Sequence, residues 1–541
     1  MLKTYQSPIL SAVAMLLAAA AFPGEGCGEG ASAKAKGRTL LLVDDHDVLY
    51  RAGTERVLLP LTRHPANPVV TETRPWELAI GWTSIHRDSR SGKYQLWYQA
   101  HAGKRARIKS HETVVCYAES ADGVQFTKPD LGLFSFNDIE QTNIVLIGNG
   151  GHGDRYCCSV LVDERDSDPA RRYKMAYYDW SPVEGREYAG LHVAFSPDGI
   201  RWTKHAGGPL NRTAYGGRGL QPPYADEGAY LETRTNRGQV RKAWPFPLTM
   251  SDACDVFFDP QRQKFAIYGK VWIQGPDGGL AWKHAMGRSE SADFLTWSKP
   301  ELLLTPDDLD PAHVEFHTSP VFFHRDRYFS LNQILHRAAG GLIDIELMLS
   351  PDGVRWERPF RQPWFLPHGS AGQFDSRSLF TNSTPIILQD EIRFYYGAYS
   401  QGAIGGGQSL ESGDQLSGIG LATMPRDRFA GIRPVAKSDQ PTLKSPLDHI
   451  GQVTFKPLDL ADCQSIKLNA DASEGTIRVE LLHEEGYRVR GFSKDDALPI
   501  QGNSLRHSVA WKENTLEQLP PGRYSLRLHL NHATAYAVTI E

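Results

Sequence analysis

The chain has 541 residues, with 59 lysines and arginines against 63 aspartates and glutamates, a formal net charge of −4 and 40% hydrophobic residues. These are globular proportions, so disordered, collagen-like and coiled-coil chains are excluded, and the near-zero charge argues against a nucleic-acid partner. The length predicts two or three domains, or one large all-β body with a smaller one, and 50 glycines and 34 prolines favour turns and short strands.

The first thirty residues have the pattern of a secretory signal peptide. Lys3 gives a weakly positive start, and residues 9–22 (ILSAVAMLLAAAAF) form an apolar run too short to span a bilayer. Cys27 follows, but Gly24-Glu25-Gly26 is a poor lipoprotein cleavage box. No later stretch resembles a membrane span. We therefore expect residues 1–30 to be a signal peptide and the mature protein to be secreted or periplasmic.

A short signature, S-x-D-x-x-x-(W/F), recurs along the chain. The four copies are residues 120–126 (SADGVQF), 196–202 (SPDGIRW), 291–297 (SADFLTW) and 350–356 (SPDGVRW), with a degenerate fifth copy at residues 423–429 (TMPRDRF). Serine and aspartate side chains bond nearby backbone N–H groups in turns, and the aromatic residue fills space between sheets. We assign Asp122, Asp198, Asp293 and Asp352 to structure.

Upstream of each copy, an apolar strand, a polar turn and an aromatic strand recur. Examples are residues 80–86 with 94–98, and residues 256–258 with 265–268, joined by hairpin turns. Five four-stranded units of this kind predict an all-β fold, a five-bladed β-propeller over residues 38–436. The early strand at residues 40–43 (LLLV) is expected to complete the ring by joining the last blade.

After a polar, proline-bearing linker the pattern changes. Residues 464–468, 476–481, 524–530 and 535–540 alternate apolar and polar side chains and contain no S-x-D copy. This alternation is typical of antiparallel strands with one buried face. We expect a small C-terminal β-sandwich, an accessory domain, over residues 437–541.

The repeated turns resemble those of the five-bladed propeller glycoside hydrolases, the superfamily of families 32, 43, 68 and 117. The likeness is closest to secreted bacterial glycosidase-like proteins, whose first blade carries a P-W-E step like Pro75-Trp76-Glu77 and whose chain ends in a sandwich. Members that hydrolyse glycosides use carboxylates on innermost strands that converge at the central channel. The N-D-P-N/D-G step of family 32 is absent, and no Asp-Asp-Glu triad maps without ambiguity.

Glycoside hydrolysis requires two carboxyl groups across one bond, one protonated and one ionised. Propeller geometry places candidates at the start of each blade's first strand, and the expected catalytic residues are Glu77, Asp252, Asp255, Glu315 and Asp375. Asp252 and Asp255 are three apart on a strand, so we expect at most one to face the channel. Asp44 and Asp45 compete for the first blade, because paired carboxylates can raise one pKa, although a strand end exposed to water explains them equally well.

The same strand starts supply candidates for substrate binding. They are Arg74, Trp76, His152, Asp154, His317 and Arg377. Trp76 is placed to stack on a sugar ring, and the arginines suit an anionic sugar because a guanidinium matches a carboxylate or sulfate.

No zinc, phosphate-loop or dinucleotide motif occurs, and the six cysteines are too scattered for a disulfide framework. We expect no cofactor and no catalytic metal. A structural calcium ion bound by channel carboxylates is chemically reasonable, but the sequence gives it no location.

The leading hypothesis is a secreted glycoside hydrolase that acts on a poly- or oligosaccharide. Two alternatives stay open: a non-catalytic carbohydrate-binding propeller, and a phosphorylase or lyase on the same scaffold. Because a fold does not determine a function, the choice between them rests on the site.

Overall fold

The computed structural model describes residues 36–151, 156–183, 186–212, 231–234, 240–243, 250–273, 283–403, 415–435 and 450–541. Regular structure in these ranges consists of β-strands and a few single-turn 3-10 helices, with no α-helix. The predicted all-β fold is therefore confirmed. No helix in the described ranges is long and apolar enough to cross a membrane. The predicted signal peptide lies outside them.

Most strands belong to antiparallel units that follow one another along the chain, and we number these units 1 to 5. Unit 1 contains β5 (Ala79–Arg87), β6 (Tyr94–His101), β7 (Thr113–Ser120) and β8 (Ile144–Leu146). Unit 2 contains β9 (Tyr156–Val162), β10 (Tyr173–Val183), β11 (Arg186–Ser196), β12 (Thr203–Lys204) and β13 (Asn211–Arg212). Unit 3 contains β16 (Met250–Asp259), β17 (Lys264–Ile273), β18 (Lys283–Ser291) and β19 (Glu301–Leu304).

Units 4 and 5 share one sheet. Unit 4 contains β20 (Val314–Phe316), β21 (Val321–His324), β22 (Arg327–His336), β23 (Leu342–Ser350) and β24 (Glu357–Phe360). Unit 5 contains β25 (Ser378–Phe380), β26 (Ile386–Ile387), β27 (Glu391–Tyr399), β28 (Ser417–Pro425) and β4 (Thr62–Arg63). A single parallel pair, Ile343 with Ser378, joins the two units. The sheets are consistent with a propeller, while the count of five blades stays an interpretation.

The repeated S-x-D turns have the structural role expected of them. In the first copy, the Ser120 hydroxyl donates to Asp122 and accepts the N–H of Gly123, and Asp122 Oδ1 accepts the N–H groups of Val124 and Gln125 at 2.8 Å each. The other three copies repeat these bonds. The fourth residue of each copy has a left-handed backbone, which glycine favours; the third copy places Phe294 there, at φ 69°.

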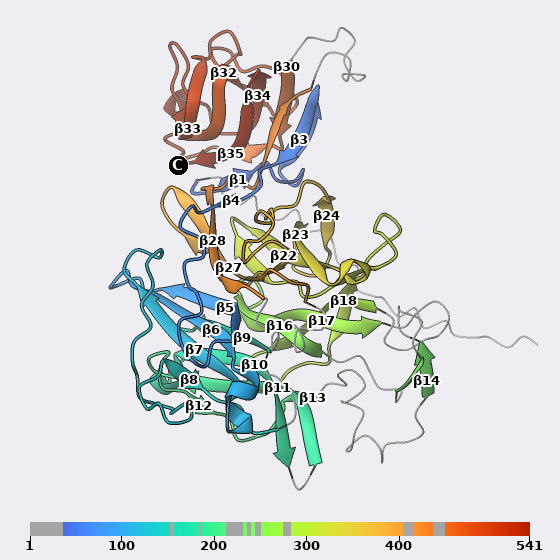
Figure 1. Ribbon diagram of the computed structural model, residues 1–541. Helices are drawn as coiled ribbons and strands as arrows, with labels where there is room; N and C mark the ends of the chain where they lie inside the picture. The colour runs from blue at the N-terminus through green and yellow to red at the C-terminus, as the bar shows by residue number, and fades with distance from the viewer. Residues whose placement is uncertain are drawn as a thin grey trace, which may run out of the picture.

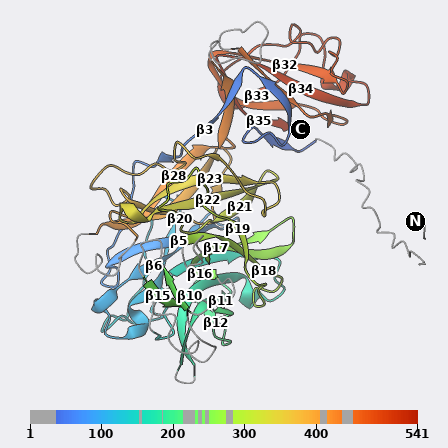
Figure 2. The same ribbon diagram turned by 90° about the vertical axis from the view of Figure 1, so that its right-hand side faces the viewer.

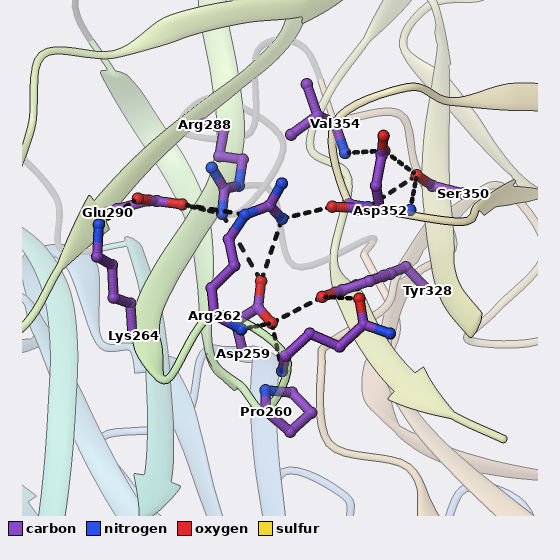
Figure 3. A network of polar contacts seen from close by, with 12 residues as sticks. Asp259, Pro260, Arg262, Lys264, Arg288, Glu290, Tyr328, Ser350, Asp352 and Val354 are labelled. Carbon is purple, nitrogen blue, oxygen red and sulfur yellow. Dashed lines mark hydrogen bonds and ion pairs between the residues drawn. The ribbon is translucent and has the colours of Figure 1, made fainter. Parts of the chain in front are cut away.

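Each turn also binds the neighbouring unit. Turn carbonyl groups accept hydrogen bonds from Tyr395 to Gly123, Trp97 to Gly199, Arg171 to Asp293 and Tyr268 to Gly353, at 2.6–2.9 Å. Figure 3 shows one of these junctions, where Asp352 accepts from Arg262 and Asp259 accepts from Tyr328 at 2.7 Å. In the degenerate fifth copy, Asp427 lies 2.5 Å from His324 of unit 4. Since unit 5 contacts unit 1, the contacts form a closed ring.

Hydroxyl groups connect the innermost strands around the centre of this ring. Ser84 of β5 donates to the carbonyl of Cys158 on β9, and Ser159 of β9 accepts the N–H of Val256 on β16, both at 2.9 Å. Ser383, before β26, donates to the carbonyl of Val256 at 2.9 Å. Units 1, 2, 3 and 5 therefore meet along a polar axis.

The C-terminal strands form a second sheet that includes N-terminal strands. Its ten antiparallel strands are β1 (Thr39–Leu41), β2 (Val48–Ala52), β3 (Thr54–Leu58), β29 (Ala430–Pro434), β30 (Ile450–Phe455), β31 (Leu458–Asp459), β32 (Ile466–His483), β33 (Ile500–Ser508), β34 (Arg523–Asn531) and β35 (Thr534–Ile540). In Figures 1 and 2 the blue strand β3 lies beside the orange and red strands of this sheet.

The expectation that residues 40–43 join the last blade is wrong. Strand β1 pairs with β35, with Thr39 opposite Thr539; Leu40 packs into the apolar core of the C-terminal sheet, while Leu41 packs against the core of units 4 and 5. The strand that joins β28 of unit 5 is β4, where Arg63 pairs with Ala422. Periodicity shows that residues 40–43 are an apolar strand, but it does not identify the strand's partner. The domain boundary near residue 437 stays a prediction.

A buried arginine connects the two parts of the chain, and its removal should destabilise the protein. Arg327, at the start of β22, lies 2.9 Å from Asp44 and 2.9 Å from Asp47, which are in the loop between β1 and β2. We expect Arg327→Met to lower the free energy of unfolding by about 3 kcal/mol, because the largely buried Asp44 loses its ion-pair partner and Asp47 is left with Arg38. Urea denaturation measures this change.

Arg433→Met is the matched control. Arg433 pairs with Glu55 at 2.7 Å, but both side chains are about half exposed. We expect a loss below about 1 kcal/mol for this exposed pair. Equal effects of the two substitutions would contradict the proposed role of Arg327.

Candidate active site

A cluster of charged side chains lies near the N-terminal ends of β16 and β20, the first and innermost strands of units 3 and 4. We call these N-terminal ends the leading ends of the inner strands. Asp252 of β16 is buried, and its Oδ1 lies 2.5 Å from Nζ of Lys270 on β17. Burial alone would raise the pKa of Asp252, but the Lys270 ammonium outweighs burial and holds the pKa below its ordinary value. Asp252 is therefore ionised at neutral pH.

Glu315 of β20 is the second acid of this cluster. Its carboxylate accepts two hydrogen bonds from the guanidinium of Arg337, one of them at 2.6 Å, and lies 2.7 Å from Nδ1 of His284 on β18. Burial opposes ionisation, yet these bonds lower the pKa of Glu315 well below its ordinary value. A carboxylate held on both oxygens is poorly placed to attack a substrate.

His317 lies between these acids and the first inner strand. Its Nδ1 is 3.0 Å from Oε1 of Gln333, and its ring stacks on Trp82 of β5 with centroids 5.4 Å apart. Trp82 has φ 44°, a left-handed backbone that is strained for a bulky side chain, and it sits at a bulge in β5. Burial and the nearby charge of Lys270 lower the pKa of His317 well below its ordinary value, so the ring is neutral.

Asp255 lies deeper along the axis than Asp252. A register shift between Met250 and Cys254 breaks the alternation of β16, so spacing alone does not determine where the two carboxyl groups point. Burial raises the pKa of Asp255 to about 7, against the lowering effect of hydrogen bonds from Ser383 and Ser159. Two carboxyl groups on one strand thus prefer opposite protonation states.

Glu77 belongs to a different cluster, inside unit 1. Its carboxylate accepts hydrogen bonds from Lys128 at 2.7 and 2.9 Å, from Tyr98 at 2.6 Å and from two backbone N–H groups. Trp76 is 1% exposed and donates to Asn143 at 3.1 Å. The expectation that Trp76 stacks on a sugar is therefore not supported, and this geometry favours a structural role for both residues.

Asp375 and the candidate arginines are also held by protein groups. Asp375 forms a two-point pair with Arg63 of β4, at 2.7 and 2.8 Å, and accepts from Tyr396 at 2.8 Å. Arg377 donates to the carbonyl of Ala339 at 2.7 Å, and Arg74 donates to Lys128 O and Asp130. The Arg63 pair connects β4 to the segment before β25 within unit 5, which is a structural task.

The competing acids, Asp44 and Asp45, lie in the loop between β1 and β2 of the C-terminal sheet. Asp45 pairs with Arg51 and Arg56, and Asp44 pairs with Arg327. Burial would raise the pKa of Asp45, but the two arginines lower it instead. The pKa of Asp45 is therefore lowered, and not raised as the pairing with Asp44 suggested.

Sequence reasoning found Asp252, Asp255, Glu315 and His317 in this region but missed their partners. Lys270 and His284 lie on the second and third strands of unit 3, and Arg337 lies in the 3-10 helix after β22, whereas the sequence candidates all came from the starts of first strands. A charged residue inside an apolar run, such as Lys270 in residues 265–272 (FAIYGKVW), is a usable signal. His152 and Asp154 lie outside the described residues.

A cavity of about 310 Å³ lies at the other end of the axis. The trailing ends of the inner strands line it, including Ile85, Val160, Val256, Phe322 and Ser383. None of the candidate acids lines this cavity, although Val256 and Ser383 adjoin Asp255. Among the described residues, no group of three histidine, cysteine or acidic side chains is arranged to hold a metal ion.

Comparison with known proteins gives structural similarities only. No family model and no curated protein matches the sequence. A solved glycoside hydrolase is similar over 68% of this chain and 92% of its own, at 13% identity and a TM-score of 0.44. A glycosyl hydrolase from Bacteroides ovatus matches over 68% and 94% of the two chains, at 18% identity and a TM-score of 0.41. A thermostable family-43 glycoside hydrolase matches over 70% and 100%, at 12% identity and a TM-score of 0.40.

Proposed function

We propose that the protein is a secreted glycoside hydrolase that cleaves a poly- or oligosaccharide at the leading ends of the inner strands. In this proposal Asp255 is the general acid and Asp252 is the ionised carboxylate. Glu77 and Asp375, which the sequence also suggested as catalytic residues, are assigned to structure.

The observation that carries the proposal is the contrast between Asp252 and Asp255. The pKa of Asp252 is held below its ordinary value by Lys270, and the pKa of Asp255 is raised to about 7 by burial. Glycoside hydrolysis requires one protonated and one ionised carboxyl group, and unequal environments are how proteins supply both at the same pH.

Incubation of the full chain with a panel of plant, algal and microbial polysaccharides tests the proposal. Mass spectrometry and reducing-end assays should detect hydrolysis products of at least one glycan in phosphate-free buffer. Products that form only with phosphate would indicate a phosphorylase, and unsaturated sugars that absorb ultraviolet light would indicate a lyase. Either result would replace hydrolysis as the reaction.

A non-catalytic carbohydrate-binding protein is the second candidate. It is favoured because several candidate carboxylates already direct their oxygens to hydrogen bonds with groups of the protein. Glu77, Glu315 and Asp375 all have their carboxylate oxygens occupied by basic or hydroxyl groups of the protein. Calorimetry that shows affinity for a glycan, with no product after prolonged incubation, would support this candidate over an enzyme.

A further inference from the structure

The Glu315–His284 pair assigns a defined protonation pattern to His284. Nδ1 of His284 lies 2.7 Å from the Glu315 carboxylate and 3.2 Å from Nη2 of Arg337. An ionised carboxylate can only accept, so we take the shorter contact to place the hydrogen on Nδ1. Burial and the charge of Lys270 lower the pKa of His284 to about 4, so the ring carries no second proton at neutral pH. The other ring nitrogen, Nε2, is therefore a hydrogen-bond acceptor.

This acceptor has no donor within the part of the chain that the structure describes. His284 Nε2 is closed to solvent and makes no hydrogen bond. A buried polar atom without a partner costs free energy, and most such atoms in native proteins are satisfied by protein, water or a ligand. A donor from outside the chain would satisfy it.

An indole ring covers the imidazole. Trp272 is directly opposite His284 in the register of β17 and β18, and their ring centroids are 3.7 Å apart. Trp272 is half-buried, so a turn of its side chain would expose this face of the imidazole. The indole face lies beside a nitrogen that can accept a hydrogen bond from a hydroxyl group. This combination suits a sugar ring, which has an apolar face and hydroxyl donors.

We propose that Nε2 of His284 accepts a hydrogen bond from a hydroxyl group of the carbohydrate, reached when Trp272 turns aside. Glu315 is then a positioning residue, because its carboxylate orients His284 and does not touch the sugar. This inference rests on the proposed carbohydrate ligand, but it concerns different atoms from the Asp252 and Asp255 pair.

Nuclear magnetic resonance of the full chain labelled with ¹⁵N-histidine tests the protonation pattern without any ligand. We expect His284, assigned by its loss in His284→Gln, to show a protonated Nδ1 and an unprotonated Nε2. Glu315→Gln should weaken this preference, and Glu315→Asp should restore part of it. A protonated Nε2 in the wild type would overturn the inference, whatever the protein binds.

The probe sugars are the methyl glycosides of glucose, galactose, mannose and galacturonic acid at millimolar concentration. Binding of one of them, measured by calorimetry, should shift the Nε2 resonance, and His284→Ala should weaken binding about tenfold, the effect of one hydrogen bond of about 1.4 kcal/mol. His483→Gln, at an exposed site in the C-terminal sheet, is the control, and it should change neither the binding affinity nor the shift of the His284 Nε2 resonance.

The outcomes separate this inference from the proposed function. Binding without a shift of Nε2 overturns the role of His284 and leaves a carbohydrate site in place. Failure of every probe sugar to bind counts against the carbohydrate ligand, and therefore against both. Trp272→Ala should also make His284 reactive towards diethyl pyrocarbonate, and a still-protected His284 would contradict the covering role of Trp272.

Discussion

An Asp255→Asn variant is expected to lose turnover and, above neutral pH, to gain stability. The amide has no proton to give to a leaving group, and loss of a general acid lowers turnover by about 10²–10⁴-fold. In the wild type, turnover should decrease as the pH rises above about 7, because the raised pKa of Asp255 sets the alkaline limb of the pH–rate profile. The profile on a glycan substrate measures both effects.

The stability effect follows from the direction of the pKa shift. Asp255 has a pKa of about 7 when folded, against 3.8 as an ordinary aspartate. Between these values the folded protein binds a proton that the unfolded chain does not, so stability falls as the pH rises. From about pH 4 to about pH 8 the wild type should lose up to about 4 kcal/mol relative to Asp255→Asn.

Two other variants check this interpretation. Burial raises the pKa of Glu346 to about 7 as well, but Glu346 pairs with Arg358, which is not among the described partners of Asp252 or Asp255, so Glu346→Gln should leave turnover unchanged. Ser159→Ala removes a bond that lowers the pKa of Asp255, so it should move the alkaline limb to higher pH. Normal turnover in Asp255→Asn would refute the assignment of the acid.

A Glu77→Gln variant should be strongly destabilised while its folded fraction keeps its activity. The ion pair of Glu77 with Lys128 is buried, with the two side chains 0% and 9% exposed. Removal of one partner from a buried pair costs about 3–5 kcal/mol, because the other charge stays buried without compensation. Urea denaturation measures the loss, and specific activity is normalised to folded protein by circular dichroism.

The double variant Glu77→Met, Lys128→Met should be less destabilised than the sum of the single variants, since it leaves no unpaired charge. Asp138→Asn is the control: its pair with Arg107 is largely exposed and should contribute less than about 1 kcal/mol. A stable Glu77→Gln protein without activity would instead return Glu77 to the catalytic residues.

Local chemistry in the sequence predicted local structure well. The S-x-D spacing predicted turns in which serine and aspartate bond the backbone, and Asp122 does so with the expected N–H groups. Partner strands were harder to predict, because a strand such as residues 39–41 carries the same apolar pattern whichever sheet it joins. Pairing depends on contacts between residues hundreds of positions apart.

The site shows the same limit. Asp252, Asp255 and Glu315 could be proposed because acids at the start of apolar strands are unusual. Their roles could not be predicted, because the ionisation of Asp252 and Glu315 depends on Lys270, His284 and Arg337, which come from other elements of the fold, and that of Asp255 depends on its burial. The bulge in β16 likewise invalidated the argument from alternation.

A crystal structure after soaking with mixed oligosaccharides tests the central claim most directly. The account predicts a sugar ring at the leading ends of β16, β18 and β20, in contact with Asp252 and His284 and with Trp272 displaced. A ring bound only in the cavity at the trailing ends of the strands, or only on the C-terminal sheet, would contradict it.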